Sequence, residues 1–265
     1  MNTKETTELA IKRHDIDAAH FQSTYSKQDQ KELNKRESVF LEGRALVLDE
    51  LTMILNKLPK GSKVLDVGCG TAHLSNWIRK QGFDVYGIEP SSEMYSFAVS
   101  NFPEIEIKQG ISSKIPYPDN FFDLIVAFEV LRYLDRTENI NSFREFKRVL
   151  KSKGCFFVTQ VNRFSTDFYF IFHNIKSIYS KAFNLTHHFC NFTTSWEQER
   201  EIKSLGLKNA TTIGRFMGST RFAYKFGKNI GNFYNSFMKK IFGNQRFSKS
   251  FYKNFTAHLI VIAEK

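Results

Sequence analysis

The sequence predicts an α/β protein built on a doubly wound, mostly parallel sheet of seven strands. Short apolar runs alternate with segments of helical periodicity, which is the pattern of a parallel sheet with helices on its faces. The first apolar run ends in a glycine turn. The composition, 42% hydrophobic and 25% charged, is that of a folded globular chain. With 265 residues the chain can bury a full-size core, so we expect one domain with additions.

Strands and helices alternate from residue 59 onward. Leu74, Trp77 and Ile78 recur at helical spacing between the first two strands, and Ser91 or Ser92 is expected to cap the next helix. Further helices are expected over 139–151 and 194–205. The seven expected strands cover 64–67, 83–88, 105–108, 122–128, 155–161, 207–213 and 255–263. In such a sheet, ligands bind beyond the carboxyl ends of the strands.

Three parts are expected along the chain. Residues 6–58 have helical periodicity, and residues 1–58 would form an N-terminal helical cap. Residues 59–214 together with 255–265 would form the core. Residues 215–254 would be a basic aromatic insertion between the last two strands, acting as a lid, a substrate element or a membrane-surface element.

The net charge of +11 is concentrated near the end of the chain. Residues 202–263 contain eleven Lys or Arg and no Asp or Glu, and Phe and Ile recur there every three or four positions from Phe222 to Ile241. This pattern predicts an amphipathic basic helix. Three interpretations stay open: a helix packing its aromatic stripe on the core, a membrane-surface helix that admits a lipid-like acceptor, or a nucleic-acid contact.

Location and metal content are predicted from what the sequence lacks. No apolar run reaches the roughly 18 to 20 residues that a membrane-spanning helix needs, and the polar start is unlike a secretory leader. We therefore expect a cytoplasmic protein, with peripheral contact at a membrane surface as an option. Cys69, Cys155 and Cys190 are odd in number and scattered, so neither a disulfide framework nor a metal site is expected.

The glycine turn after the first strand predicts a nucleoside-binding site. Gly68-Cys69-Gly70 lets backbone N–H groups approach a ligand, and Glu89 ends the next strand, where a carboxylate can accept both hydroxyl protons of a ribose. Dinucleotide-binding loops expect Gly or Ala where this chain has His73. Asp66 would repel a pyrophosphate but suits a cationic aminoacyl sulfonium.

These segments resemble the class I S-adenosylmethionine-dependent methyltransferases, in particular the type that includes quinone-biosynthesis and other small-molecule enzymes. Residues 64–71, 85–94 and 115–123 are similar to the first three motifs of that family, and residues 129–134 and 146–154 continue the order. The resemblance implies a Rossmann-like methyltransferase fold and S-adenosyl-L-methionine as cofactor. It also implies that the cofactor lies against Asp66, Gly68, Cys69, Gly70, Glu89, Pro90, Met94, Ile111, Ser112 and Phe128.

Within this set the resemblance divides the roles. Asp66 and the glycines would line the methionine end, Glu89 would bind the ribose, Pro90 to Ser112 would surround the adenine, and Phe128 would lie beside the sulfonium. Met94 and Phe128 could equally be core residues. The chain departs from the family where Ile111 replaces a common Asp, so that the adenine contact must come from the backbone or from Ser112. It also departs where Arg132-Tyr133 replaces a His-rich pair.

Methyl transfer from a sulfonium is an in-line displacement that relies on positioning and desolvation. A general base is needed only if the acceptor must lose a proton. Spacing identifies no catalytic residue, and the candidates are Glu129 and the histidines at 20, 187 and 188. Tyr25 and Arg44 are candidates for closing over the cofactor carboxylate. The predicted function is methylation of a small or lipid-like acceptor; the alternatives are an RNA methyltransferase or a catalytically silent cofactor-binding protein.

Overall fold

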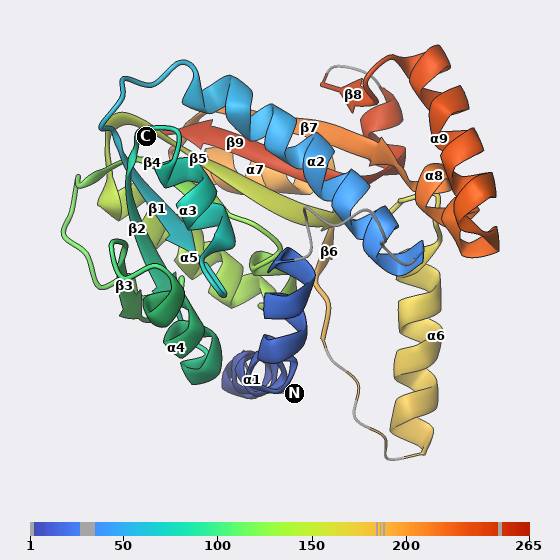
Figure 1. Ribbon diagram of the computed structural model, residues 1–265, viewed down its shortest axis with the longest axis horizontal. Helices are drawn as coiled ribbons and strands as arrows, with labels where there is room; N and C mark the ends of the chain where they lie inside the picture. The colour runs from blue at the N-terminus through green and yellow to red at the C-terminus, as the bar shows by residue number, and fades with distance from the viewer. Residues whose placement is uncertain (1–2, 27–34, 184, 186, 188, 249–250) are drawn as a thin grey trace.

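A computed structural model describes residues 3–26, 35–183, 185, 187, 189–248 and 251–265. Helices cover both faces of one twisted sheet (Figure 1). In the part of the chain described, the strand order is β3-β2-β1-β4-β5-β9-β7-β8, with β6 beside β5. The strands are β1 (Lys63–Val67), β2 (Asp84–Glu89), β3 (Glu106–Gln109), β4 (Phe122–Ala127), β5 (Leu150–Asn162), β6 (Phe192–Thr193), β7 (Lys208–Met217), β8 (Arg246–Phe247) and β9 (Thr256–Glu264).

The predicted doubly wound, mostly parallel sheet is confirmed. β1 pairs in parallel with β2 and β4, and β4 pairs in parallel with β5. β9 runs antiparallel between β5 and β7. The two-residue strands β6 and β8 are additions to the seven expected strands. Because β1, β2 and β4 point the same way, the residues that follow them meet at one edge of the sheet.

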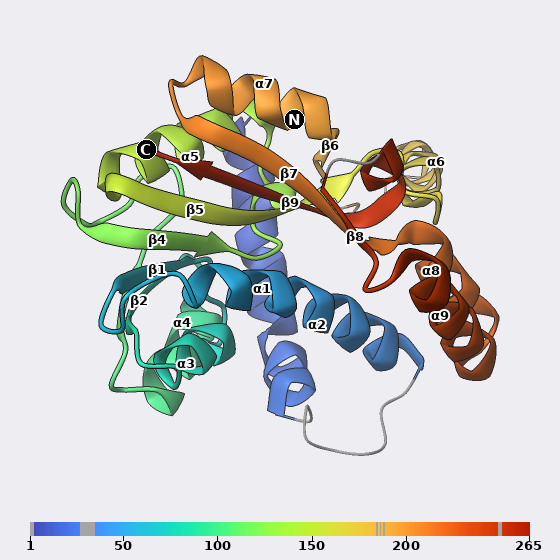
Figure 2. The same cartoon turned by 90° about the horizontal axis from the view of Figure 1, so that it is seen from above.

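Two helical layers bury the sheet. In Figure 2, α2, α3 and α4 lie on one face, and α5 and α7 lie on the other. Leu51 and Ile78 are fully buried in the first layer, and Phe143 and Ile202 are fully buried in the second. These helices are α2 (Lys35–Leu55), α3 (His73–Arg79), α4 (Ser92–Asn101), α5 (Arg136–Val149) and α7 (Ser195–Ser204).

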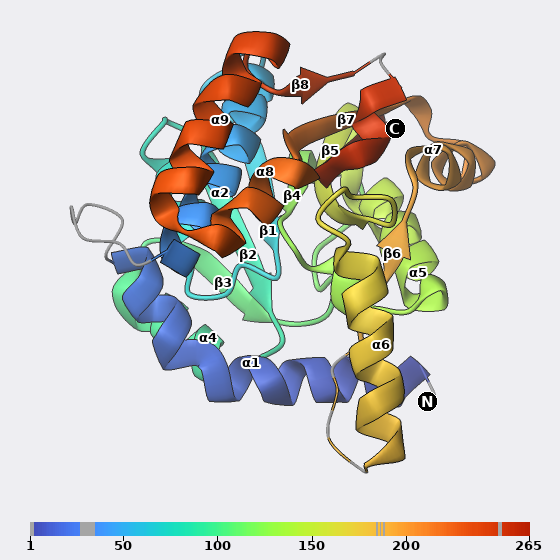
Figure 3. The ribbon, with the colours of Figure 1, turned by 90° about the vertical axis from the view of Figure 1, so that its right-hand side faces the viewer.

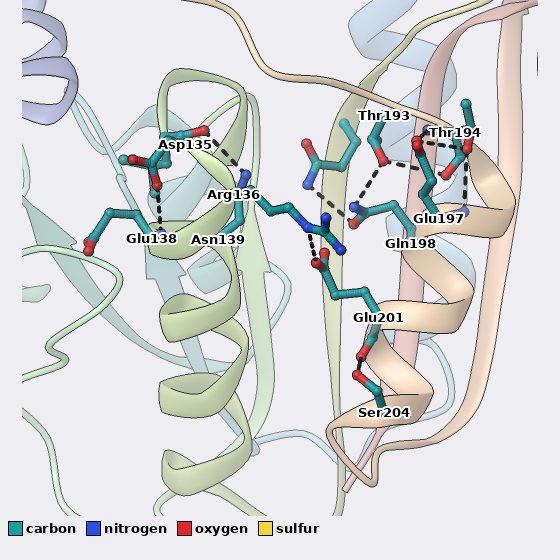
Figure 4. A network of polar contacts seen from close by, with 12 residues as sticks. Asp135, Arg136, Glu138, Asn139, Thr193, Thr194, Glu197, Gln198, Glu201 and Ser204 are labelled. Carbon is teal, nitrogen blue, oxygen red and sulfur yellow. Dashed lines mark hydrogen bonds and ion pairs between the residues drawn. The ribbon is translucent and has the colours of Figure 1, made fainter. Parts of the chain in front are cut away.

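Local sequence signals explain the ends of these helices. The capping role expected of Ser91 is confirmed, since its Oγ accepts a hydrogen bond from Met94 N at 3.2 Å. Thr194 and Glu197 form a reciprocal capping box at the start of α7. Figure 4 shows this box beside an ion pair that links α5 to α7, in which Arg136 Nε lies 3.2 Å from Glu201 Oε1.

The N-terminal helix α1 (Thr3–Ser26) lies across the carboxyl edge of the sheet. It is attached to the start of α4, because Asp15 Oδ1 accepts hydrogen bonds from Ser91 Oγ at 2.5 Å and from Glu93 N at 3.3 Å. It is attached to α3 through Gln22 Oε1, which lies 3.2 Å from His73 Nε2. This helix therefore covers the edge at which the predicted ligand residues meet.

The insertion differs from the single helix that was expected. It forms α8 (Gly218–Ala223), a 3₁₀ turn η3 (Tyr224–Phe226) and α9 (Lys228–Phe242), with the break at Gly227, whose φ is +136°. Its aromatic stripe does not pack on the core, because Phe233 is 77% exposed, so the core-packing interpretation is wrong.

The structure adds one long helix that the sequence analysis did not assign, α6 (Tyr169–Ala182), which projects from the body (Figure 1). Short 3₁₀ turns at η2 (Leu131–Tyr133) and η4 (Phe251–Phe255) complete the described elements. Among the described helices, none is both long enough and apolar enough to cross a membrane.

Candidate functional site

A large cavity of about 1160 Å³ opens at the carboxyl edge of the sheet. It lies beneath α1 and is bounded by the residues that follow β1, β2 and β4. All ten predicted cofactor residues line it: Asp66, Gly68, Cys69, Gly70, Glu89, Pro90, Met94, Ile111, Ser112 and Phe128. Residues from the ends of β1, β2 and β4, from α4 and from the segment after β3 therefore meet around the cavity, as the prediction of a single bound ligand requires.

The glycine turn after β1 needs its glycines. Gly68 has φ +64°, and a Cβ there would lie 2.6 Å from Val130 Cγ2. Gly70 has φ +56°, and its N–H points to Glu89, donating to Oε2 at 2.8 Å. Backbone at these angles favours residues without a side chain. The turn thus brings bare backbone to the cavity wall and ties β1 to the end of β2.

Glu89 is buried, with 4% of its surface exposed, yet its carboxylate is held by two backbone donors. Gly70 N donates to one oxygen, and Ser91 N donates to the other at 2.9 Å. Burial raises the pKa of Glu89 to about 7, against the opposing effect of these two N–H groups. The group is therefore oriented for ligand hydroxyls and holds a proton more readily than an exposed glutamate does.

Asp66 is also buried, and Ser75 Oγ donates to its Oδ2 at 2.6 Å. Burial raises the pKa of Asp66 to about 7, opposed by that hydrogen bond and by the charge of Arg44. Thr71 also lines the cavity, and its buried Oγ has no hydrogen-bond partner in the described part of the chain. A buried hydroxyl without a partner is costly, so this end of the cavity suits a polar, positively charged ligand group.

Met94, Ile111 and Ser112 also line the cavity. Ser142 Oγ donates to the Glu138 carbonyl at 2.7 Å, so Ser112 Oγ, 2.8 Å from Ser142 Oγ, is the donor in that pair. Ser112 Oγ therefore keeps a free lone pair for an amino group of a ligand.

A charged group lies on the far side of the cavity, after β4. Glu129 has φ +59°, an uncommon angle for a residue with a side chain, and its N–H donates to Thr159 Oγ at 2.7 Å. Its carboxylate accepts a hydrogen bond from Arg132 Nη1 at 2.6 Å and lies 3.5 Å from His258 Nδ1. The packing of β9 beside β5 brings His258 to this position.

These contacts determine the charge of Glu129. Although burial acts in the opposite direction, hydrogen bonding to His258 and the charge of Arg132 lower the pKa of Glu129 below its usual range. The group stays a carboxylate, which makes it a poor proton acceptor and a suitable partner for an imidazolium. Gly43 of α2 leaves space for the ring, because a Cβ there would lie 3.0 Å from His258 Nε2.

The remaining candidates separate clearly. Arg44 lines the cavity, whereas neither His20 nor His187 is among the described residues that do so. His188 and the side chain of Tyr25 lie outside the described residues. Sequence reasoning missed His14, Tyr169, Arg221, Lys225 and His258, all of which line the cavity. Within the described chain, no group of three His, Cys, Asp or Glu gathers as a metal site would require.

Comparison with known families identifies the central part of the chain. Residues 65–158 match the family model described as a methyltransferase domain. A demethylmenaquinone methyltransferase of Chlorobaculum parvum is 35% identical over 100 residues, which cover 37% of this chain and 40% of that protein. A ubiquinone biosynthesis O-methyltransferase of Azorhizobium caulinodans is 24% identical over 171 residues, covering 63% of this chain and 66% of that protein. The chain thus spans less than half the length of the first of these relatives.

Solved structures agree on the fold. An S-adenosylmethionine-dependent methyltransferase from Thermotoga maritima superposes with a TM-score of 0.57 at 19% identity, covering 88% of this chain and 95% of that one. Another from Archaeoglobus fulgidus gives a TM-score of 0.56 at 15% identity, covering 84% and 94%. The predicted Rossmann-like methyltransferase fold is therefore confirmed.

Proposed function

We propose that this chain, which carries a class I S-adenosylmethionine-dependent methyltransferase domain, transfers a methyl group from S-adenosyl-L-methionine to a small, lipid-like acceptor. The observation that carries the proposal is the meeting of all ten predicted cofactor residues around one cavity. The buried carboxyl groups of Asp66 and Glu89 in that wall, held by Ser75 and by two backbone N–H groups, support a ligand with a cationic end and a diol.

The residues present fit this cofactor. The bare glycine backbone, where a Cβ at Gly68 would clash, leaves room for close approach, and Thr71 Oγ is buried without a partner in the described chain. In this proposal Asp66 and the glycine turn hold the aminoacyl sulfonium end, and Glu89 accepts the ribose hydroxyls. Ser112 Oγ accepts from the adenine amino group, which replaces the Asp that the family often has at position 111.

When bound, S-adenosyl-L-methionine supplies an electrophilic methyl group on a sulfonium. The chain's part is to orient the acceptor, to exclude water and to take up any proton the acceptor loses. We assign the last task to His258, whose Nδ1 faces Glu129 at 3.5 Å. The Glu129 carboxylate, fixed by Arg132, would stabilise the imidazolium after His258 accepts the proton.

The acceptor class follows from the size and lining of the cavity. Ordinary ligand pockets measure roughly 300–1,000 Å³, so about 1160 Å³ leaves room for a cofactor and an acceptor together. Val39, Phe40, Phe216 and Tyr224 supply further apolar and aromatic lining from α2, β7 and η3. The names of the quinone methyltransferases similar to this chain support an acceptor of lipid-like, quinone-like character.

We retain the division into a cap (1–58), a core (59–214 with 255–265) and an insertion (215–254) as part of the proposal. The cap would close the cavity, since α1 residues line it. The insertion would contact a membrane surface peripherally, because exposed Phe residues among lysines are typical of interfacial helices. An acceptor dissolved in that membrane would then reach the cavity.

Titration calorimetry with S-adenosylhomocysteine tests the core of the proposal. We expect micromolar-range binding by the wild type, and at least about tenfold weaker binding by Glu89→Ala, because the charge-assisted hydrogen bonds to the ribose are lost. Glu93→Ala is the matched control, since Glu93 is an exposed carboxylate of α4 that does not line the cavity. Absent binding, or equal losses in the two variants, would contradict the assignment.

A further inference from the structure

The helix α6 presents an apolar face to solvent. Ile171, Phe172, Ile175, Ile178 and Tyr179 follow helical spacing on one side of it, and each is 51–70% exposed. The helix is anchored at its first turn, where Tyr169 and Phe170 pack against Val161, Cys190 and Phe192. Its core contacts therefore do not explain its apolar side, and contiguous apolar surface of this kind marks an interaction site.

The helix α9 repeats this arrangement. On its inner side, Gly231 lies against the Tyr224 ring, and Met238 is buried against Met217 and Phe247. Its outer side carries Ile230, Phe233, Phe237 and Ile241, each 48–77% exposed. The helix thus stays attached to the body without using its aromatic stripe.

The two helices lie on the same side of the molecule. Figure 3 looks onto that side and shows α9, α8 and α6 in front of the sheet. The Phe168 and Phe222 rings lie 6.0 Å apart, and the Phe222 and Phe226 rings lie 5.3 Å apart, which joins α6 to η3. Lys225 Nζ lies 4.9 Å from the Phe172 ring centre. We name the exposed apolar residues of α6, η3 and α9 the docking face.

Basic residues outnumber acidic ones around the docking face. Residues 168–194 and 202–263 contain no Asp or Glu. Lys176, Lys181, Lys225, Lys228 and Lys240 are exposed on its helices. In the described chain, the acidic groups that pair with basic residues of these two segments include Asp167 with Arg221, Glu42 with Lys239, Glu50 with Arg246 and Glu199 with Lys253. The surface therefore combines large apolar side chains with a positive rim, which is complementary to an anionic bilayer.

We propose that the docking face inserts into the interfacial layer of an anionic membrane, with α6 and α9 lying against the lipid. The cavity reaches the same elements, since Tyr169, Arg221, Tyr224 and Lys225 all line it. If the proposed function holds, on which this step rests, the acceptor enters the cavity from the bilayer without crossing water. A lipid-like acceptor is poorly soluble, so this route supplies it where it is concentrated.

Vesicle flotation of the full chain tests the docking face. We expect binding to vesicles of phosphatidylcholine with about 30 mol% phosphatidylglycerol that is at least tenfold tighter than binding to phosphatidylcholine alone, and that weakens with added salt. The double substitution Ile175→Ser with Ile178→Ser should weaken binding at least about tenfold, and so should Phe233→Ser with Phe237→Ser. The α6 pair is the decisive variant, because only this face assigns α6 a role.

The matched control is Met53→Ser with Val99→Ser, two exposed apolar residues of α2 and α4 that do not belong to the docking face. It should bind vesicles within about twofold of the wild type. Circular dichroism and S-adenosylhomocysteine binding, measured on every variant, separate loss of docking from loss of folding and from failure of the proposed cofactor site. Vesicle binding with no cofactor binding would overturn the proposed function and leave the docking face standing.

Two results would overturn the docking face itself. One is that the wild type binds S-adenosylhomocysteine but does not bind vesicles. In that case, loss of self-association by the α6 variant in sedimentation would assign the face to a second copy of the chain, and a gel shift of single-stranded RNA by the wild type would assign it to RNA. The other is equal vesicle binding by the α6 variant, the α9 variant and the control.

Discussion

Asp66 and Glu89 predict a steep pH dependence of cofactor binding. Burial raises the pKa of each carboxylate to about 7, whereas a sulfonium and a ribose diol both favour the ionised form. Each group is about nine-tenths ionised at pH 8 and about one-tenth ionised at pH 6. The fraction with both groups ionised therefore falls about 100-fold over these two pH units. We expect the affinity for S-adenosyl-L-methionine to fall by about this factor.

The sign follows from linkage. Free Asp66 and Glu89 hold protons below pH 7 that the complex releases, so affinity rises with pH until both groups are ionised. Calorimetry at pH 7 in two buffers of different ionisation enthalpy should show about one proton released per ligand bound, half from each group. Glu89→Gln leaves one titrating group, so the affinity ratio between pH 8 and pH 6 should shrink to about tenfold.

The same variant should also bind more weakly at pH 8. Gly70 N–H and Ser91 N–H each use one carboxylate oxygen of Glu89, and an amide nitrogen in either place would face a donor. Loss of a hydrogen bond to a charged group is worth about 1.5–3 kcal/mol, so we expect an affinity about 10- to 100-fold lower. Equal affinity of the wild type at pH 6 and pH 8, or proton uptake on binding, would refute the reasoning.

Four further outcomes are expected. Gly68→Ala should weaken cofactor binding more than tenfold, whereas Gly61→Ala, also at positive φ but with open space around it, should change only the melting temperature. Asp66→Asn should have a higher melting temperature than the wild type at pH 8 and the same melting temperature at pH 4. The neutral Asp66 carboxyl contributes its full share of folding stability below about pH 4, and this contribution is lost as the pH rises toward 7. His258→Gln should lower kcat with unchanged S-adenosylhomocysteine affinity, and an unchanged kcat would remove its assignment as base. Thr194→Ala should cost about 1 kcal/mol in urea unfolding, with no change in cofactor binding.

The meeting of Asp66, the glycine turn and Glu89 at one cavity could be predicted because its determinants are local. A glycine turn after a buried strand, and an acid at the end of the next strand, are fixed by parallel pairing of β1 with β2. Neighbours in the chain therefore become neighbours in space. His258 could not be found in this way, since it lies 129 positions from Glu129 and meets it only because β9 folds back antiparallel beside β5.

The strained backbone of Glu129 was equally invisible in the sequence. Its residue type made it a candidate base, but neither φ +59° nor the ion pair with Arg132 can be derived from a pattern of apolar residues. The structure reverses the expected role, because a carboxylate held by an arginine and a histidine loses its basicity. Arg132, where the chain departs from the family pattern, left the acceptor side undefined in the sequence. In the structure its guanidinium donates a hydrogen bond to the Glu129 carboxylate.

The two helices of the docking face show what amphipathic periodicity can and cannot predict. The spacing from Ile230 to Ile241 predicts an apolar side, and the spacing from Ile171 to Tyr179 offered the same signal for α6. Periodicity does not say whether that side meets the core, and both helices are held by other contacts. The charge of the flanking residues distinguishes the two cases. An apolar stripe that packs on the core gains no stability from having few acidic residues around it. Around a membrane-facing stripe, a single acidic residue would oppose binding to anionic lipid. Placing one on each helix, as Lys181→Glu and Lys228→Glu, should therefore weaken vesicle binding while the cofactor site stays intact.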